Sequence, residues 1–157
     1  MKGEDLAQVV GRLGLDPLER EGGWFRRIFT GPSDASGRAT CTTIYALFTR
    51  EQFSALHRLD AWEQFFFLDG DAFEVFRIEA DGRGRTETLG KGSPHLVFEP
   101  GCWFGGKPVE GGAFGWSLIS CVVTPGFEWD GFELGEPKAL LERYPKFGDE
   151  IDCLTRG

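Results

Sequence analysis

His57 and Glu63 are the side chains of this sequence whose types and spacing are best suited to proton transfer. They lie six residues apart, in two short segments that we expect to form neighbouring β-strands. Alternate side chains of such strands point to the same face, so both residues would point into the protein interior. An imidazole and a carboxyl group so placed could form an acid/base couple, and a structural ion pair fits the pattern equally well. His95, the other histidine, lies outside any second ligand motif.

His57 has apolar neighbours on its predicted face. Alternation places Phe53, Ala55 and Leu59 on the same side of the strand. An apolar surround disfavours a charged imidazole and leaves a neutral ring that can accept or donate a proton near pH 7. We interpret His57 as a functional residue in a pocket, with a core histidine bonded to a backbone carbonyl as the structural alternative.

Glu63 shares its predicted inward face with Phe65 and Phe67. An unpaired carboxylate in such a place costs several kcal/mol, or the carboxyl group stays protonated. We therefore expect Glu63 to meet His57, an arginine or a ligand group that donates a hydrogen bond.

The elements that must position these residues are mostly short strands joined by glycine turns. Apolar spacing predicts one helix over residues 4–13, and proline positions predict a second over 136–144. Regular short strands favour a sandwich or barrel, so we expect an all-β fold with short N- and C-terminal helices in one domain over residues 1–157. The predicted strands cover residues 21–29, 41–48, 51–59, 64–68, 72–78, 86–89, 96–98, 101–104, 114–123 and 127–132.

Charge and composition exclude several classes of function. A net charge of -8 argues against a nucleic-acid partner, because phosphate binding requires a concentrated basic surface. The N-terminus lacks a basic segment followed by an apolar one, and no apolar run approaches the roughly 20 residues that cross a bilayer, so we expect no membrane partner and a cytoplasmic location. The four cysteines have no CxxC pairing, which argues against a zinc site or a disulfide framework.

Several motifs, in order, resemble one known family. The chain from about residue 13 to 145 resembles the small cupin group catalogued as a domain of unknown function. That resemblance implies a cupin jelly roll, a double-stranded β-helix barrel, and a homodimer. The motifs that carry it are Glu21-Gly22-Gly23-Trp24, Thr42-Thr43-Ile44-Tyr45, Leu56-His57-Arg58-Leu59, Glu63, Pro100-Gly101-Cys102-Trp103 and Thr124-Pro125-Gly126-Phe127.

The cupin resemblance also implies a metal site that this chain only half retains. Its ligands would be His57, a histidine at 59, Glu63 and a histidine at 104, but the chain has Leu59 and Phe104. Two ligands of four do not hold a divalent ion tightly, so we expect no metal and no other cofactor. The family also commonly has His-Pro where this chain has Glu19-Arg20 and often a histidine where it has Phe66, so the pocket of this chain is expected to be more aromatic.

The predicted partner is a small, partly apolar organic molecule. One hypothesis is a metal-independent isomerase, epimerase, lyase or cyclase in which His57 is the base, Glu63 its partner and Tyr45 a possible proton donor, although a strand tyrosine more often packs. The other is a non-catalytic cupin that binds a metabolite; a metal-dependent oxygenase has the least support. The predicted ligand-binding residues are Thr43, Phe65, Phe67, Trp103, Phe104 and Cys121, and no cysteine has a second histidine to activate it.

Overall fold

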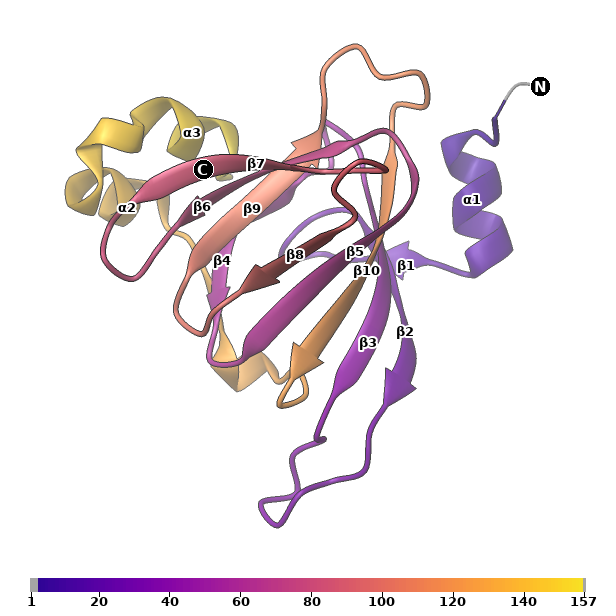
Figure 1. Cartoon of the computed structure of the whole chain (residues 1–157), viewed down its shortest axis with the longest axis horizontal. Coiled ribbons are helices and arrows are strands. Elements are labelled where there is room, and N and C mark those ends of the chain that lie inside the picture. The colour runs from indigo at the N-terminus through magenta and orange to yellow at the C-terminus, as the bar shows by residue number, and fades with distance from the viewer. Residues whose placement is uncertain (1–2, 157) are drawn as a thin grey trace.

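Two antiparallel β-sheets pack face to face in the computed structural model, which describes residues 3–156 (Figure 1). The six-stranded sheet has the order β1-β2-β3-β10-β5-β8, and the five-stranded sheet has the order β11-β4-β9-β6-β7. The fold is all-β with short terminal helices, as the sequence predicts. The strands are β1 (Asp16–Pro17), β2 (Trp24–Thr30), β3 (Thr42–Phe48), β4 (Ser54–Leu59), β5 (Trp62–Gly70), β6 (Phe73–Ile78), β7 (Gly84–Leu89), β8 (His95–Phe98), β9 (Trp103–Pro108), β10 (Ser117–Thr124) and β11 (Phe132–Leu134).

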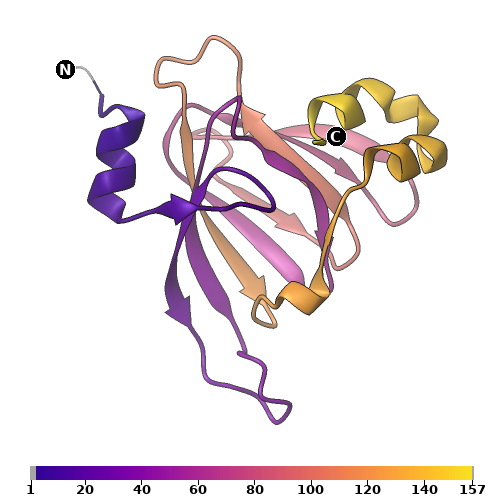
Figure 2. The same ribbon diagram turned by 180° about the vertical axis from the view of Figure 1, so that it is seen from behind.

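Helix α1 (Leu6–Leu13) confirms the prediction at the N-terminus, and its ends follow from its sequence. Asp5 and Gln8 form a reciprocal capping box at its start, and Gly14 ends it with a left-handed φ of 62°. The helix packs its apolar side, including the fully buried Val9, against Trp116 and its neighbours. It lies at one end of the molecule, away from the other helices (Figure 2).

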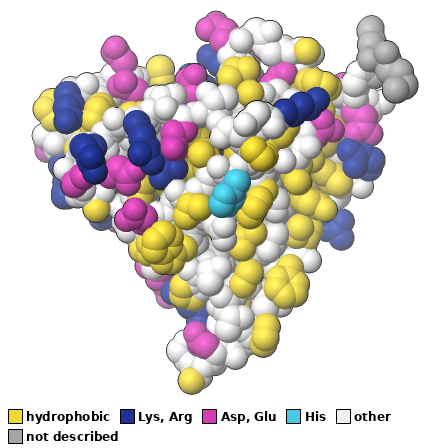
Figure 3. Space-filling view, in the orientation of Figure 1, with side chains coloured by type: hydrophobic (Ala, Val, Ile, Leu, Met, Phe, Trp, Pro, Cys, Tyr) yellow, Lys and Arg dark blue, Asp and Glu magenta, His cyan; other side chains and the backbone are white. Residues whose placement is uncertain are grey.

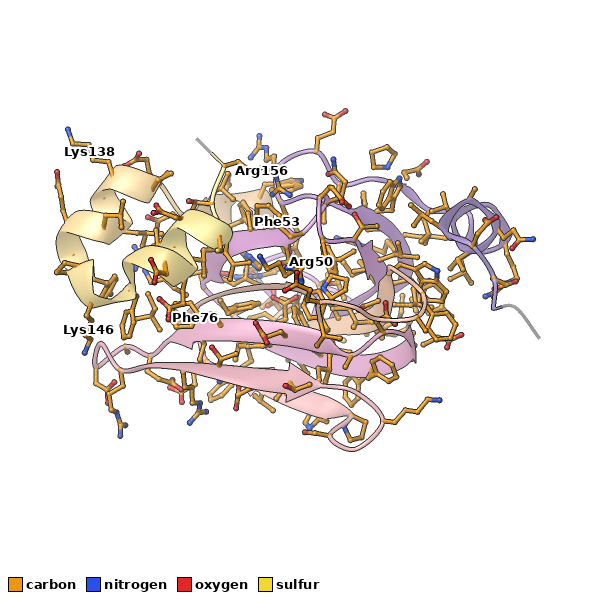
Figure 4. The ribbon with its side chains drawn as sticks, turned by 90° about the horizontal axis from the view of Figure 1, so that it is seen from above. Arg50, Phe53, Phe76, Lys138, Lys146 and Arg156 are labelled. Atoms are coloured by element: carbon orange, nitrogen blue, oxygen red, sulfur yellow. The ribbon has the colours of Figure 1, made fainter. Side chains whose placement is uncertain are left out.

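The C-terminal helices α2 (Pro137–Arg143) and α3 (Gly148–Cys153) cover the outer face of the five-stranded sheet. Helix α2 was predicted from Pro137 and Pro145, whereas α3 was not predicted. In Figure 4 the labelled Arg156 lies next to Phe53, where its guanidinium stacks 3.8 Å over the Phe53 ring and donates to the Phe53 carbonyl at 2.9 Å. These contacts fix the end of the chain to the start of β4. No helix among residues 3–156 is long and apolar enough to cross a membrane.

Strand register in the six-stranded sheet decides which side chains face the interior. Cross-strand partners share a face, so residues paired with Glu63 or Cys121 also point between the sheets. One inward row runs Thr42, Val123, Glu63 and Phe98, and the next runs Arg27, Ile44, Cys121, Phe65 and Leu96.

The opposite face of the same sheet is almost free of charge. Two outward rows cross five strands, and they run Phe29, Thr43, Val122, Gln64 and Val97, then Arg26, Tyr45, Ser120, Phe66 and His95. Phe29 is 54% exposed and Val97 39%. Figure 3 shows yellow side chains gathered on the front of the molecule around a cyan histidine.

Candidate functional site

A cavity of about 240 Å³ opens between the two sheets, beside the two inward rows of the six-stranded sheet. Most of its wall is apolar, and a few polar groups converge in it, which is the usual composition of a small-molecule site. Its lining residues are Leu18, Glu21, Phe25, Arg27, Thr42, Ile44, His57, Leu59, Glu63, Cys121, Val123, Phe127, Trp129 and Phe132.

His57 lies on β4 and is 2% exposed. Its Nδ1 lies 2.7 Å from the carbonyl oxygen of Ala55. Because a carbonyl can only accept, Nδ1 is the nitrogen that carries the proton. In the neutral ring Nε2 is then an acceptor, and it lies 4.0 Å from Oε2 of Glu63.

Glu63 lies on β5 and is 6% exposed. Its Oε2 is buried and has no hydrogen-bond partner. Burial raises the pKa of Glu63 well above its usual value, the negative charge of Glu21 raises it further, and a contact with the Cys121 thiol offsets part of the rise. Burial therefore favours the neutral form of the Glu63 carboxyl group, and that form can donate a hydrogen bond into the cavity.

Glu21 is the second carboxyl group of the cavity, and it was not among the predicted site residues. Its Oε1 accepts a hydrogen bond from Ser54 and lies 3.8 Å from Nδ1 of His57. The turn that brings it there requires glycine, because Gly23 has a φ of 78° and a Cβ at that position would lie 2.5 Å from the Leu47 carbonyl oxygen. The Glu21-Gly22-Gly23 motif was the signal in the sequence that pointed to this residue.

Thr43 and Tyr45 do not line the cavity, contrary to the prediction. Their strand, β3, pairs with β10 so that Ile44 faces Cys121, and alternation turns Thr43 and Tyr45 to the outer face. Thr42 and Ile44 take the inward positions instead. Tyr45 packs near α1, in the cluster around Trp116.

Trp103 is also outside the cavity. It lies on the outer face of the five-stranded sheet, packed among residues of α2 and α3, with the Arg58 guanidinium 4.6 Å over its ring. Helix α3 was not predicted, so no helix was expected to cover the face of the sheet that carries Trp103.

Phe65, Phe67 and Phe104 do not line the cavity either, contrary to the prediction, because they pack in the hydrophobic core next to it. Phe65 and Phe104 are each 1% exposed, and Phe67 packs against the same core. The ring of Phe104 lies 4.4 Å from that of His57 and 3.9 Å from that of Phe98. The Phe104 ring thus covers one side of His57, and of the predicted ligand-binding residues Cys121 lines the cavity.

An aromatic flap, residues 125–132, forms the outer wall. The sequence predicts a strand over 127–132, but a 3-10 turn (Trp129–Gly131) precedes the short β11. Phe127, Trp129 and Phe132 contact one another through edge-on rings and all line the cavity. Because three aromatic residues in six resemble a strand, composition alone misassigned this segment.

Hydrogen bonds tie the flap at both ends. Arg38 donates to the carbonyl oxygen of Gly126 at 2.8 Å and also pairs with the Asp60 carboxylate. The backbone N–H of Phe127 donates to Oγ1 of Thr42 at 2.9 Å, and that of Asp60 donates to the carbonyl oxygen of Gly131 at 3.0 Å.

Replacing Arg38 by methionine is expected to loosen the flap. The change removes three hydrogen bonds while keeping the length of the side chain, so local opening becomes easier. We expect the free energy of local opening to fall by about 1.4 kcal/mol or more, which corresponds to at least about tenfold faster exchange. Hydrogen exchange measured by mass spectrometry should show this increase in peptides that cover residues 125–131. Peptides from β6 and β9 are the internal control, and unchanged exchange in the flap would contradict its anchoring by Arg38.

The residues of this site do not fit a resident divalent metal. Leu59 lines the cavity beside His57, and Phe104 is the cross-strand partner of His57, so both supposed ligand positions point inward and carry hydrocarbon. Among residues 3–156, no group of three histidine, cysteine or acidic side chains is placed to hold a metal ion. Of the four supposed ligand positions, one imidazole and one carboxyl group remain, which is fewer than metal sites use.

Two packed antiparallel sheets with a cavity between them are the architecture of the cupin class. The chain belongs to the family described as Cupin superfamily (DUF985), whose model matches residues 7–135.

Two solved structures have the same fold, and each aligns with nearly the whole chain. Protein SO0799 from Shewanella oneidensis is 30% identical, with 98% of this chain and 99% of that chain aligned and a TM-score of 0.89. A hypothetical protein from Leishmania major is 28% identical, with 98% and 100% aligned and a TM-score of 0.88.

More distant likeness extends to a cupin enzyme. Oxalate decarboxylase from Bacillus subtilis is 14% identical with a TM-score of 0.59, and the match covers 89% of this chain but 37% of that enzyme. At this identity the likeness concerns the fold alone. No curated protein matches the chain.

Proposed function

We propose that this protein binds a small, partly apolar organic molecule between its two sheets and transfers protons on that molecule with His57 and Glu63, without a metal ion. The observation that carries the proposal is the pairing of two free atoms: Nε2 of His57 lies 4.0 Å from the unpartnered Oε2 of Glu63. One of these atoms can accept a proton and the other can donate one. A single ligand in the cavity can contact both.

The roles follow from the two protonation states. The neutral carboxyl group of Glu63 donates its proton to an oxygen of the ligand, while Nε2 of His57 removes a proton from the neighbouring atom. The resulting carboxylate and imidazolium form an ion pair, and returning the protons in the other order leaves the enzyme unchanged. Such a proton shift is the chemistry of isomerases and epimerases, and it begins many lyase and cyclase reactions.

Water exclusion supports this division of roles. The Phe104 ring covers one side of His57, and the aromatic flap forms the outer wall of the cavity. In a site of low dielectric, hydrogen bonds to a developing charge are stronger than they are in water. Ala55 holds the His57 ring in one tautomer, so that Nε2 keeps its lone pair toward the ligand.

Deuterium exchange tests the proposal without knowledge of the natural ligand. Benzylacetone and α-hydroxyacetophenone are small aromatic ketones whose α-protons exchange slowly in D2O. The wild-type protein is expected to accelerate that exchange, followed by proton NMR. His57→Gln and Glu63→Gln are expected to lose the acceleration by about 10²-fold or more.

Tyr45→Phe is the matched control, because Tyr45 lies on the outer face of β3. It should exchange the ketones as fast as the wild type does. Equal rates for the wild type and His57→Gln, with ketone still bound, would contradict the catalytic proposal.

A non-catalytic cupin that captures a metabolite is the second candidate, and one observation favours it. The bond between Nδ1 of His57 and the Ala55 carbonyl also fits a histidine that only shapes a pocket. In that case the ketones bind, His57→Gln weakens their binding, and no variant changes their exchange rate. Measuring ketone binding and exchange rates on the same set of variants therefore distinguishes the two candidate functions.

A further inference from the structure

We infer that the ligand of this cavity is an organic cation, a protonated amine carried on a small aromatic or apolar body. This inference rests on the part of the proposed function that assigns ligand binding to the cavity, and it does not depend on turnover. Two acidic side chains, Glu21 and Glu63, lie near the His57 imidazole on opposite sides of its ring. Glu21 lies 3.8 Å from Nδ1 of His57, and Glu63 lies 4.0 Å from Nε2.

Glu63 is the group that points to an absent partner. Its side chain is more than nine-tenths buried, it lines the cavity, and its Oε2 has no hydrogen-bond partner. Buried polar atoms in folded proteins are almost always satisfied, so an unpartnered carboxyl oxygen facing an open cavity indicates a donor that arrives with the ligand. An ammonium group supplies three such donors and the charge that a carboxylate prefers.

The aromatic flap supplies the second half of a site for an organic cation. Trp129, Phe127 and Phe132 line the cavity beside Phe25, and cations are attracted to the faces of such rings. The flap already binds one cation of the chain itself, because the Arg20 guanidinium lies 4.7 Å from the Trp129 ring centroid. Carboxyl groups combined with several aromatic rings make up the usual receptor for an alkylammonium group.

Among residues 3–156, no arginine or lysine forms an ion pair with Glu63. Burial raises the pKa of the Cys121 thiol well above its usual value, so Cys121 carries no charge. Nδ1 of His57 faces the Ala55 carbonyl oxygen, which leaves Nε2 on the side of Glu63. Arg27 is the cationic member of the lining, and it lies exposed on the edge-side strand β2, where water screens its charge.

Binding of a cation should change which group holds the proton. An ammonium beside Glu63 stabilises its carboxylate form, so Glu63 releases a proton when the amine enters. The carboxylate and Nε2 of His57 then both act as acceptors toward the bound amine.

Three probes of nearly equal size test the charge preference by isothermal titration calorimetry at pH 7: phenethylamine, phenethyl alcohol and phenylacetate. Phenethylamine is expected to bind at least about tenfold more tightly than the alcohol, and phenylacetate more weakly than either. Titrations in phosphate and in Tris should show that phenethylamine releases protons. The alcohol should release none.

Variants identify the groups responsible. Glu21→Gln and Glu63→Gln should each reduce the preference for the amine, and Glu63→Gln should abolish proton release. Glu133→Gln is the control, because it removes one negative charge outside the cavity, where Glu133 pairs with Arg58. It should leave all three affinities unchanged.

The wild-type titrations alone can overturn the inference. If phenethyl alcohol binds as well as phenethylamine, the cavity does take small organic ligands and the inference of a cation is wrong. If phenylacetate binds best, Arg27 sets the preference, and the inference is equally wrong. If none of the three probes binds, the proposed binding function fails together with the inference.

Discussion

Glu63→Gln is expected to be more stable than the wild type, by an amount that grows as the pH rises. Glu63 has a folded-state pKa well above 4.5, because it is buried near Glu21, whereas in the unfolded chain it ionises near 4.5. Between these two values the folded protein holds a proton that the unfolded chain has lost. Unfolding is then favoured by about 1.4 kcal/mol for each pH unit. Glutamine cannot ionise, so the variant escapes this loss.

Urea unfolding at about pH 5, 6 and 7 checks the prediction. The difference in free energy of unfolding between Glu63→Gln and the wild type should increase by about 1.4 kcal/mol from one pH to the next, until the folded-state pKa is reached. Glu74→Gln, an exposed position on β6, is the control and should follow the wild-type curve. Parallel curves for Glu63→Gln and the wild type would mean that Glu63 is ionised in the folded protein.

The double variant Leu59→His with Phe104→His is expected to acquire a site for Zn²⁺ or Mn²⁺. Both positions point toward His57 and Glu63, and the Ala55 carbonyl already fixes the His57 ring with Nε2 free to coordinate. Three histidines and one carboxylate then complete a four-ligand set. Without metal the variant should be less stable by several kcal/mol, because it loses a buried leucine and a stacked phenylalanine ring.

Metal-dependent stability reveals the new site. Thermal unfolding of the double variant should shift upward when Zn²⁺ is added, by the equivalent of about 2.7 kcal/mol at one hundred times the Kd. The wild type and the triple variant that also carries His57→Ala should show no such shift. A Zn²⁺ effect of equal size in the triple variant would mean that the metal binds elsewhere.

The sequence predicts the fold and the central pair because both depend on local periodicity. Alternation along β4 and β5 is enough to turn His57 and Glu63 to the same interior. Alternation along β3 does not decide which of its faces points inward. Thr42 and Ile44 on one face are as compatible with an interior position as Thr43 and Tyr45 on the other. The register with β10 decides between the two faces, and register depends on strands far apart in the chain.

Two parts of the site come from irregular backbone, which periodicity does not describe. Glu21 reaches His57 from a glycine turn 36 residues earlier in the chain, and the aromatic flap folds as a 3-10 turn over the cavity. Trp103 was misplaced for a related reason, since α3, a helix too short to give a clear apolar pattern, covers its face.

The anchoring of the flap at both ends bears on how fast ligands exchange. Because Arg38, Thr42 and Asp60 hold the backbone, the part of the outer wall left to move is the 44% exposed Trp129 side chain with Arg20 against it. Rotations of exposed side chains take picoseconds to nanoseconds, far less than loop opening. Entry should therefore be fast and nearly the same for all small ligands. The protein then discriminates among them by how long each one stays.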